Sequence, residues 1–422
     1  MNDAPADLLT VDQALAVLDE APVRPRVMRV KLQDAEGFRL AAPVVADRDY
    51  PPFDKSLMDG YAVRSVDLQA APTELNVVGE IAAGQSASVS LQPGQAMAIM
   101  TGAPMPDGAD SVVPVEDSDS AGPNRVRLLA TAQAGRFIAR RGSDCAAGSV
   151  LLEKGTKLEA AQLAVAASIG AAEVDVFARP CVAVLSTGDE LVPIDQTPGP
   201  AQIRNSNNIM LVALLRRLGC DVTDLGSVND DPKLIRQSIE KGLQSDILFV
   251  SGGMSMGQYD FVPKILIDLG VDLKITKLRI KPGKPFIFGV KGQGARGEGQ
   301  VYSPLAPCPS PLAPAFVFGL PGNPVSSFVC TLRLCSRLIA RMSGWANLDR
   351  WISAKLSAPL ETNGPREFYQ PAVFDGSIVQ PLKWKGSADI YTLAMANALI
   401  VRPENAPARP AGAEVKILEI PS

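Results

Sequence analysis

Residues 251–260 of the chain read SGGMSMGQYD. Directly before them, residues 246–250 (DILFV) form a short, almost continuous apolar run, which is typical of a strand buried on both faces of a parallel sheet. Helical periodicity resumes at residues 261–269. A strand, a glycine-rich turn and a helix in this order form an anion-binding site in α/β proteins, because bare N–H groups and the positive end of the helix dipole face the ligand.

The same order of elements recurs on both sides of this stretch. The strand-like runs and the turns that follow them are CVAVL (181–185) with STGDEL (186–191), 221–228 with NDDP (229–232), and 316–320 with PGNP (321–324). Strands that alternate with helices predict a parallel, doubly wound sheet. Ligands of such sheets bind beyond the carboxyl ends of the strands, so we expect the acids and glycines of these turns to converge on one crevice.

Composition limits the classes of function. A net charge of −4 does not favour nucleic-acid binding, which usually shows a basic face. No apolar run reaches the ~18 residues that span a bilayer, so we expect a cytoplasmic protein with no membrane or nucleic-acid partner. The cysteines have no CxxC spacing, which disfavours a zinc site.

The chain contains no histidine. This excludes Ser-His-Asp triads, Cys-His pairs, imidazole zinc ligands and the usual general base. Any catalysis must therefore depend on carboxylates, lysines, backbone N–H groups or a metal held by oxygen atoms. Magnesium fits that set of donors best.

The segments around the central stretch predict further domains. An amphipathic helix is expected at residues 8–18, with Thr10 or Asp12 near its start, and short strands separated by glycines are expected between residues 73 and 130. Short strands beyond residue 345 indicate a small sandwich or barrel. Residues 291–315 are rich in Gly, Pro and Ser and predict a flexible surface excursion. The expected domains are I (8–48 and 145–179), a β-rich inserted domain II (49–144), III (180–344) and IV (345–422).

Six motifs in register resemble the molybdopterin molybdenumtransferases, the family of MoeA and the gephyrin E domain. The motifs are PPFDKSLMDGYAV (51–63), TGAPMPDGAD (101–110), STGDEL (186–191), SGGMSMGQYD (251–260), KPGKP (281–285) and LPGNPVSS (320–327). The resemblance implies an elongated homodimer with a molybdopterin-binding α/β domain and a C-terminal β-barrel. It also implies insertion of molybdenum from molybdate into adenylylated molybdopterin, with release of AMP in the presence of magnesium.

In this family the ligand cleft lies between the central domain of one subunit and the first two domains of the other. The catalytic positions that the resemblance implies are Asp59, Asp144, Glu190, Asp230, Asp260, Lys277 and Lys281, with Glu190, Asp230 and Asp260 at the metal. The expected substrate-binding positions are Thr101, Ser251, Gly252, Gly253, Ser255, Gly257, Lys284, Pro321, Gly322, Asn323, Pro324 and Ser387. Residues 291–315 look longer than the usual link in the family.

The acids at the predicted strand ends are Asp189, Glu190, Asp230, Asp231 and Asp260. Each one alone is also compatible with an ordinary helix N-cap. Two carboxylates ~4 Å apart repel by roughly 4 kcal/mol at an effective dielectric constant of 20, unless a cation or proton intervenes. A magnesium ion held by one or two carboxylates and a substrate phosphate would relieve that repulsion and polarise the phosphoryl oxygen.

Lysines supply the opposite charge. On one continuous strand Lys277, Arg279 and Lys281 would share a face, because side chains alternate with period two. Lys281 and Lys284 bracket a Pro-Gly turn, so we expect a basic rim for molybdate and pyrophosphate. The alternative is an edge strand that lysines protect from pairing with another chain.

Two other functions remain open from the sequence. A molybdopterin adenylyltransferase shares the central fold and the SGG turn, but the domains on both sides disfavour it. A dimeric scaffold of the gephyrin E type is disfavoured by the intact acids and lysines. Expected partners are a second copy of the chain, the molybdopterin adenylyltransferase and molybdoenzyme chaperones; the sequence does not distinguish molybdate from tungstate.

Overall fold

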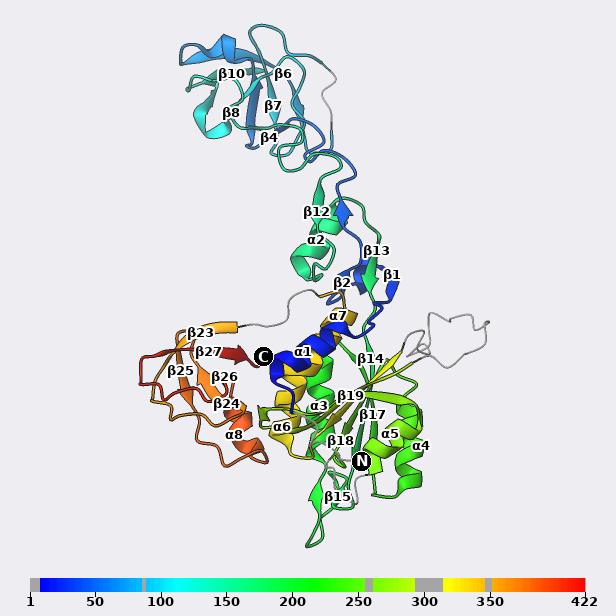
Figure 1. Cartoon of the computed structure of the whole chain (residues 1–422). Helices are drawn as coiled ribbons and strands as arrows, with labels where there is room; N and C mark the ends of the chain where they lie inside the picture. Colours follow the sequence, from blue (N-terminus) through cyan, green and yellow to red (C-terminus); the bar gives the residue numbers. More distant parts are fainter. Residues whose placement is uncertain (1–7, 86–88, 255–260, 293–313, 346–350, 422) are drawn as a thin grey trace, which may run out of the picture. The chain divides into compact units, whose positions relative to one another are not determined.

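The computed structural model describes residues 8–85, 89–254, 261–292, 314–345 and 351–421. The chain divides into two compact units (Figure 1). Unit 1 consists of Met1–Arg29, Gly37–Ala41 and Asp175–Ser422, and unit 2 consists of Val30–Glu36 and Ala42–Val174. The four domains expected from the sequence divide the chain more finely, and their boundaries stay a prediction.

Unit 2 is built mainly from strands, as predicted for its inserted region. Its six-stranded sheet has the order β8-β5-β7-β6-β10-β9. The strands are β5 (Gly60–Val63), β6 (Thr73–Ile81), β7 (Gln95–Ile99), β8 (Ser111–Pro114), β9 (Ser118–Ser120) and β10 (Arg125–Leu128). Two apolar clusters, around Ile99 and around Leu128, form its core. A Cβ atom at Gly60 would lie 2.0 Å from the carbonyl oxygen of Val113, so only glycine allows β5 to approach β8 this closely.

Short pairs of strands and short helices complete unit 2 and its connections. The pairs are β3 (Val44–Val45) with β12 (Val150–Leu152) and β4 (Lys55–Ser56) with β11 (Ile138–Ala139). The helices are η1 (Leu32–Asp34), η2 (Ser65–Leu68), η3 (Val115–Asp117) and α2 (Ala160–Ser168). A three-stranded sheet is formed by β1 (Val27–Lys31), β13 (Glu173–Phe177) and β2 (Arg39–Leu40), in that order.

The central sheet of unit 1 has the order β17-β14-β18-β22-β21-β19. Its strands are β14 (Cys181–Thr187), β17 (Asp221–Val228), β18 (Ile247–Ser251), β19 (Val271–Lys277), β21 (Pro285–Lys291) and β22 (Ala315–Leu320). The first four strands of that order pair in parallel, whereas β19 and β21 are antiparallel. The predicted parallel sheet is confirmed for these four strands, and β21 adds antiparallel pairs with β22 and β19 at one edge. The link between β19 and β21 is too short for the crossover that parallel strands need.

Helices cover both faces of this sheet (Figure 1). One face packs against α1 (Val11–Glu20), α3 (Ser206–Arg217), α6 (Pro324–Cys330) and α7 (Ser336–Met342), the last two joined by the π-helical η4 (Thr331–Cys335). The other face packs against α4 (Pro232–Gly242) and α5 (Phe261–Asp268). Within β14, Val182 and Val184 face the first layer while Ala183 and Leu185 face the second. Burial on both faces explains the unbroken apolar run.

Of the two residues expected near the start of helix α1, Thr10 is its N-cap. Thr10 accepts a hydrogen bond from the N–H of Gln13, whose side chain bonds back to the N–H of Thr10. This capping box satisfies two of the free donors at the helix start. The helix begins and ends slightly later than the predicted residues 8–18.

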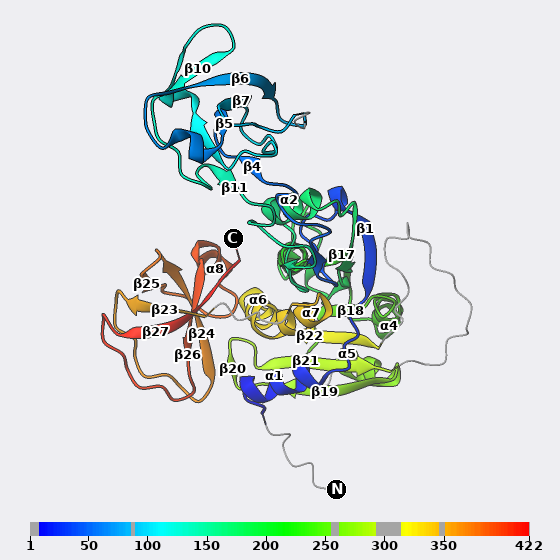
Figure 2. The same ribbon diagram turned by 90° about the horizontal axis from the view of Figure 1, so that it is seen from above.

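The C-terminal part of unit 1 is a closed barrel, one of the two architectures expected. Its strands are β23 (Trp351–Leu356), β24 (Glu367–Phe374), β25 (Ile378–Pro381), β26 (Ala398–Arg402) and β27 (Glu414–Glu419). Pairing of β24 with β26 closes the order β24-β25-β23-β27-β26. Figure 2 shows α8 (Ile390–Met395) beside the barrel, and β20 (Ile280–Lys281) adds to β24. The small pair β15 (Leu191–Val192) and β16 (Ile203–Arg204) lies next to the central sheet.

Two further expectations concern the excursion at residues 291–315 and membrane-spanning segments. Most of the excursion expected at residues 291–315 lies outside the described residues. Across the described ranges, no helix is long and apolar enough to cross a membrane.

Candidate functional site

Three parallel strands end side by side at the carboxyl edge of the central sheet. Ser186 of β14 pairs with Ser251 of β18, and Ser251 pairs in turn with Leu320 of β22. The turns that begin with Gly188, Gly252 and Pro321 therefore start next to one another. The three turns therefore start together, as predicted, and their convergence on one crevice stays a prediction.

The turns after β18 and β22 are bonded to each other. The N–H of Gly252 donates to the carbonyl oxygen of Leu320 at 3.1 Å, and Ser251 Oγ donates to the carbonyl oxygen of Pro321 at 3.4 Å. The side chain of Ser327, on α6, also donates to the carbonyl oxygen of Pro321. Ser251 and Gly252, at the start of the first turn, are thus bonded directly to the start of the second turn.

Glycine is required in the turn after β18. Gly252 and Gly253 have φ values of +94° and +63°. A Cβ atom at Gly252 would lie 2.3 Å from the carbonyl oxygen of Thr187, and one at Gly253 would lie 2.8 Å from its Oγ1. Side chains at either position would push β14 and β18 apart. Ser255, Gly257 and Asp260, which were predicted for the same site, lie outside the described residues.

Asn207 was missed by the sequence analysis. It lies in the first turn of α3, is 9% exposed, and donates from Nδ2 to Ser251 Oγ at 2.9 Å and to the carbonyl oxygen of Gly322 at 2.7 Å. One side chain therefore contacts both ligand turns. The sequence did contain a signal, because the RNSNN stretch has three asparagines where a single N-cap would suffice.

The other two asparagines of that stretch hold the neighbouring strands. Asn205 caps α3 by accepting from the N–H of Asn208. The Nδ2 atom of Asn208 donates to Asp224 Oδ1 at 2.6 Å and to the carbonyl oxygen of Gly226 at 2.9 Å, and its Oδ1 accepts from Ser186. This network fastens β17 to β14.

Four of the five predicted acidic residues, Asp189, Glu190, Asp230 and Asp231, lie on two loops that contact each other. The N–H of Asp230, after β17, donates to Asp189 Oδ1 at 3.0 Å, and the N–H of Gly188 donates to the carbonyl oxygen of Val228 at 3.1 Å. Glu190 and Asp230, two of the three expected metal ligands, are therefore on adjoining loops. Asp231 instead caps α4 by accepting from the N–H groups of Lys233 and Leu234, so the N-cap alternative holds for Asp231.

Glu190 and Asp230 offer carboxylate oxygens, the type of donor that magnesium prefers. Gly188 has φ +150°, and a Cβ atom there would lie 2.5 Å from Glu190 Oε2, so the glycine leaves room for the carboxylate of Glu190. Among the described residues, no three Asp, Glu, Cys or His side chains gather into a metal cluster. Magnesium needs only one or two carboxylates when waters and phosphate oxygens complete its shell.

The expected basic strand face is wrong. Lys277 ends β19 opposite Pro285, and Lys281 lies in a separate strand, β20, which pairs with the barrel. Between them the guanidinium of Arg279 lies 3.4 Å from Glu404 and donates to the carbonyl oxygen of Leu8. Bonds to the barrel and to the N-terminal segment interrupt the continuous strand on which the prediction of one basic face depended.

The two predicted lysines at the KPGKP turn have different surroundings. The ammonium of Lys281 lies 4.4 Å from the ring centre of Phe368, whereas Lys284 is exposed. Between them Gly283 has φ +117°, and a Cβ atom there would lie 2.5 Å from Cys330 Sγ on α6. The turn is therefore packed directly against α6.

Ser387, predicted to bind substrate, contacts the first turn of α6. The N–H of Val325 donates to the carbonyl oxygen of Ser387 at 3.1 Å, which joins the loop after β25 to the PGNP turn. Asn323 is the N-cap residue of α6 but makes no capping bond through its side chain, and Pro324 occupies the first turn. Gly322 and Asn323 are exposed at this edge.

Unit 2 joins two of its three predicted site residues. Thr101 donates its N–H and its hydroxyl group to Asp59 Oδ1, at 2.6 and 2.8 Å. These bonds lower the pKa of Asp59, the one from the backbone more strongly. Asp144 has other neighbours: its N–H donates to the carbonyl oxygen of Tyr50 at 2.9 Å, and Ser143 Oγ donates to its carboxylate at 3.2 Å.

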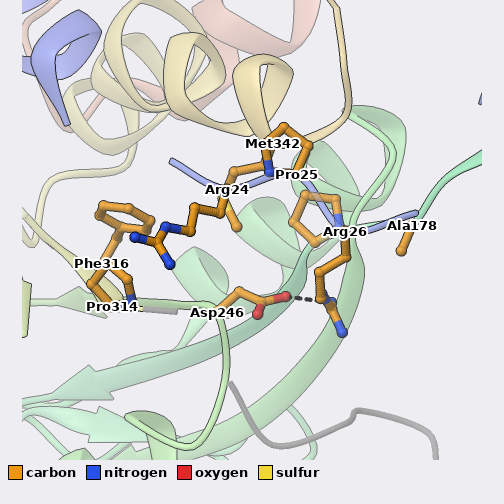
Figure 3. Close-up of a pocket in the computed structure, with 9 residues that line it drawn as sticks. Arg24, Pro25, Arg26, Ala178, Asp246, Pro314, Phe316 and Met342 are labelled. Atoms are coloured by element: carbon orange, nitrogen blue, oxygen red, sulfur yellow. Dashed lines mark hydrogen bonds and ion pairs between the residues drawn. The ribbon is translucent and has the colours of Figure 1, made fainter. Parts of the chain in front are cut away.

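A cavity of about 230 Å³ lies at the opposite, amino-terminal edge of the central sheet (Figure 3). Arg26 lies 2.7 Å from Asp246 in its wall, and the N–H of Cys181 also donates to Asp246. Burial raises the pKa of Asp246, although Arg26 opposes the shift. None of the residues predicted for the site lines this cavity, whose lining is Arg24, Pro25, Arg26, Ala178, Pro180, Asp246, Pro314, Phe316 and Met342.

The fold and the site define an α/β protein of the molybdopterin-binding type, with ligand turns at the carboxyl edge of its sheet, a β-rich unit and a C-terminal barrel. Family models match almost the whole chain in three parts. They are the MoeA N-terminal region (domain I and II) at residues 9–170, a probable molybdopterin binding domain at residues 183–341, and the MoeA C-terminal region (domain IV) at residues 353–420. The chain belongs to the molybdopterin molybdenumtransferase family.

Individual relatives are similar to this chain over most of their length. The chain is 37% identical to a molybdopterin molybdenumtransferase of Nostoc sp. over 405 residues, which cover 93% of this chain and 88% of the relative. It is 32% identical to molybdopterin molybdenumtransferase 1 of Mycobacterium tuberculosis, covering 94% of this chain and 95% of the relative. The crystal structure of a molybdopterin biosynthesis MoeA protein from Pyrococcus horikoshii matches with a TM-score of 0.82 at 28% identity, over 98% of this chain and 100% of that one.

Proposed function

We propose that this protein is the enzyme that inserts molybdenum from molybdate into adenylylated molybdopterin and releases AMP. Membership of the molybdopterin molybdenumtransferase family supports this reaction. The observation that carries it furthest is the joined edge of the sheet, where two glycine turns lie beside two acidic loops. Such an edge offers N–H groups to an anion and carboxylates to a cation.

The backbone of the two turns binds the phosphate of the substrate in this proposal. The bonds described above fix Ser251, Gly252, Pro321 and Gly322 before the substrate arrives. The N–H of Gly252 is already donated to Leu320, so we assign the phosphate to the N–H groups that follow it, beginning with that of Gly253. Preorganised donors of this kind stabilise developing negative charge without reorganisation. Asn323, Pro324 and Ser387 extend the same surface toward the barrel. Ser255 and Gly257 are assigned to substrate binding from the sequence motif alone.

Magnesium is proposed at Glu190 and Asp230, with Asp260 as a third ligand from the sequence motif. When bound, the ion would neutralise phosphate charge and polarise the phosphoryl oxygen. Glu190 and Asp230 provide the negative charge for the ion on two loops that are already fastened together. Lys277, Lys281 and Lys284 are proposed to attract molybdate, each from its own position rather than from one strand face.

We propose that two copies of the chain share the site, with Asp59, Thr101 and Asp144 contributed by the partner of the subunit that supplies the sheet edge. Exposed apolar residues support a dimer: Val45 and Val150 face each other across β3 and β12 and remain 41% and 48% exposed. Mixed dimers of Asp59→Asn and Glu190→Gln subunits should recover activity, because one of the two sites is then free of both substitutions. Activity no higher than that of either variant alone would contradict a shared site.

The reaction itself is tested with purified protein, adenylylated molybdopterin, molybdate and magnesium, by following AMP and finished cofactor. We expect both products to depend on molybdate. Formation of adenylylated molybdopterin from molybdopterin and ATP would instead support the adenylyltransferase alternative, which matches to the N-terminal and C-terminal MoeA regions disfavour. Binding without turnover would support the scaffold. The cytoplasmic location stays a prediction that cell fractionation tests. Contacts with the adenylyltransferase and with molybdoenzyme chaperones also stay predictions.

A further inference from the structure

The two ligand turns belong to different strands and have one side chain in common. Asn207 reaches them from α3, with Nδ2 2.9 Å from Ser251 Oγ and 2.7 Å from the carbonyl oxygen of Gly322. We propose that Asn207 is the positioning residue of the substrate site, which sets the spacing of the SGG and PGNP turns for the adenylylated pterin. This inference rests on the proposed function for the identity of the ligand, but not for the link between the turns.

The orientation of the Asn207 amide follows from its partners. The carbonyl oxygen of Gly322 can only accept a hydrogen bond, so the atom facing it must be the nitrogen. Both hydrogens of that NH₂ group are then used, one for each turn. Asn207 is also buried to more than nine-tenths, so water does not replace these bonds easily.

The remaining bonds between the turns do not replace Asn207. Ser251 Oγ to the carbonyl oxygen of Pro321 is long, at 3.4 Å, and the Gly252 to Leu320 bond continues the pairing of the strands rather than fixing the turns beyond them. The carbonyl of Gly322 lies two residues past β22, where the strand ladder has ended. Asn207 is therefore placed to fix the part of the PGNP turn that reaches the ligand.

Asn208 supplies a matched control. It is the next residue of the same helix, is more buried at 3% exposure, and also donates both hydrogens of its amide, to Asp224 and Gly226. Its bonds hold β17 and make no contact with the two ligand turns. Asn208→Ala also removes the bond that its Oδ1 accepts from Ser186, so it loses three side-chain hydrogen bonds and Asn207→Ala loses two, but only Asn207→Ala releases the turns.

The first test is amide hydrogen exchange on full-length protein without substrate. We expect Asn207→Ala to speed exchange of the peptide that carries Gly252 about tenfold or more, and Asn208→Ala to speed exchange at Gly226, whose N–H is bonded to Asp224. Unchanged exchange at Gly252 in Asn207→Ala would overturn the proposal. If the alanine variant does not fold, Asn207→Asp keeps the shape and replaces the donors with acceptors.

The second test is the Michaelis constant for adenylylated molybdopterin. Asn207→Ala should raise KM about tenfold, the effect of losing one to two hydrogen bonds, with a smaller change in kcat. Asn208→Ala should lower the melting temperature at least as much as Asn207→Ala does. It should, however, leave KM near the wild-type value. Equal rises of KM in both variants would overturn a specific role for Asn207. A wild-type protein without turnover would refute the proposed function alone, since the exchange result does not depend on it.

Discussion

Thr101 and Asp59 are joined by two hydrogen bonds to a single oxygen atom. The N–H of Thr101 lies 2.6 Å, and its hydroxyl oxygen 2.8 Å, from Asp59 Oδ1. Two segments that are 42 residues apart in the sequence are thereby fixed together at the surface of unit 2. Both bonds use Oδ1, and no described residue bonds to the second carboxylate oxygen, Oδ2. This arrangement orients an exposed carboxylate that would otherwise rotate freely.

Asp59→Asn should remove the charge while keeping this arrangement. The amide oxygen of asparagine can accept both bonds from Thr101, so we expect the melting temperature to stay within about 2 °C of wild type for a surface change of this kind. If the charge of Asp59 acts on the reacting groups, kcat should fall by roughly two to three powers of ten. Both are measured on the purified variant.

Asp375→Asn is the control for this comparison. Asp375 also accepts backbone N–H groups, from Ser377 and Ile378, and its pKa is lowered in the same way, but it lies in a turn of the barrel. We expect full activity from it. A full-speed Asp59→Asn protein would show that the charge has no part in the reaction.

Thr101→Val tests the electrostatic side of the same pair. Asp59 has a lowered pKa, so its bonds stabilise the fold above the unfolded-state pKa, and this contribution is lost as the pH falls through the folded-state value. Valine removes the hydroxyl but keeps the backbone N–H, so the pKa of Asp59 should rise part of the way toward 3.8. The titration midpoint of the Asp59 carboxyl carbon, followed by NMR, measures the shift. Thr101→Ser keeps both donors and should leave the midpoint unchanged; a matching shift in the serine variant would contradict the assignment.

Arg26→Leu should destabilise the protein without affecting the chemistry. It leaves the carboxylate of Asp246, which is 6% exposed, without its cationic partner. Removing one partner of a buried pair typically costs about 3–5 kcal/mol. The free energy of unfolding should therefore fall by several kcal/mol in a urea titration, while the remaining folded protein keeps its KM, because the pair lies at the amino-terminal edge of the sheet. Asp246→Asn in the same protein removes the unpaired charge and should recover part of the loss. A raised KM with unchanged stability would contradict this separation.

The sequence was informative where local pattern decides the structure. The buried runs 181–185 and 246–250 are typical of strands covered on both faces, and Gly252 and Gly253 directly after the second run predicted a turn. The failure at Lys277, Arg279 and Lys281 has a non-local cause: β20 pairs with β24 of the barrel, and Arg279 bonds to Glu404. The alternation of side chains along a strand contains no information about partners elsewhere in the chain. Asn207 was missed for a related reason, because its two partners are 44 and 115 residues away.

The last prediction separates the anion-binding residues from the metal-binding residues. Lys277→Met removes a positive charge at the end of β19 and should raise the molybdate concentration needed for half-maximal rate, with little change in magnesium dependence. Glu190→Gln removes a proposed ligand of the cation without much change of shape, and should slow AMP release by roughly two to three powers of ten. Adenylylated molybdopterin should still bind to Glu190→Gln, since the glycine turns contact it independently.

Lys274→Met is the control for charge alone: Lys274 lies on the same strand as Lys277, and its ammonium is paired with Asp272 at 2.5 Å. An equal effect of Lys274→Met and Lys277→Met on the molybdate requirement would show that net charge, rather than a site at Lys277, attracts the anion. A Glu190→Gln protein that fails to bind the adenylylated pterin would contradict the division between the two groups.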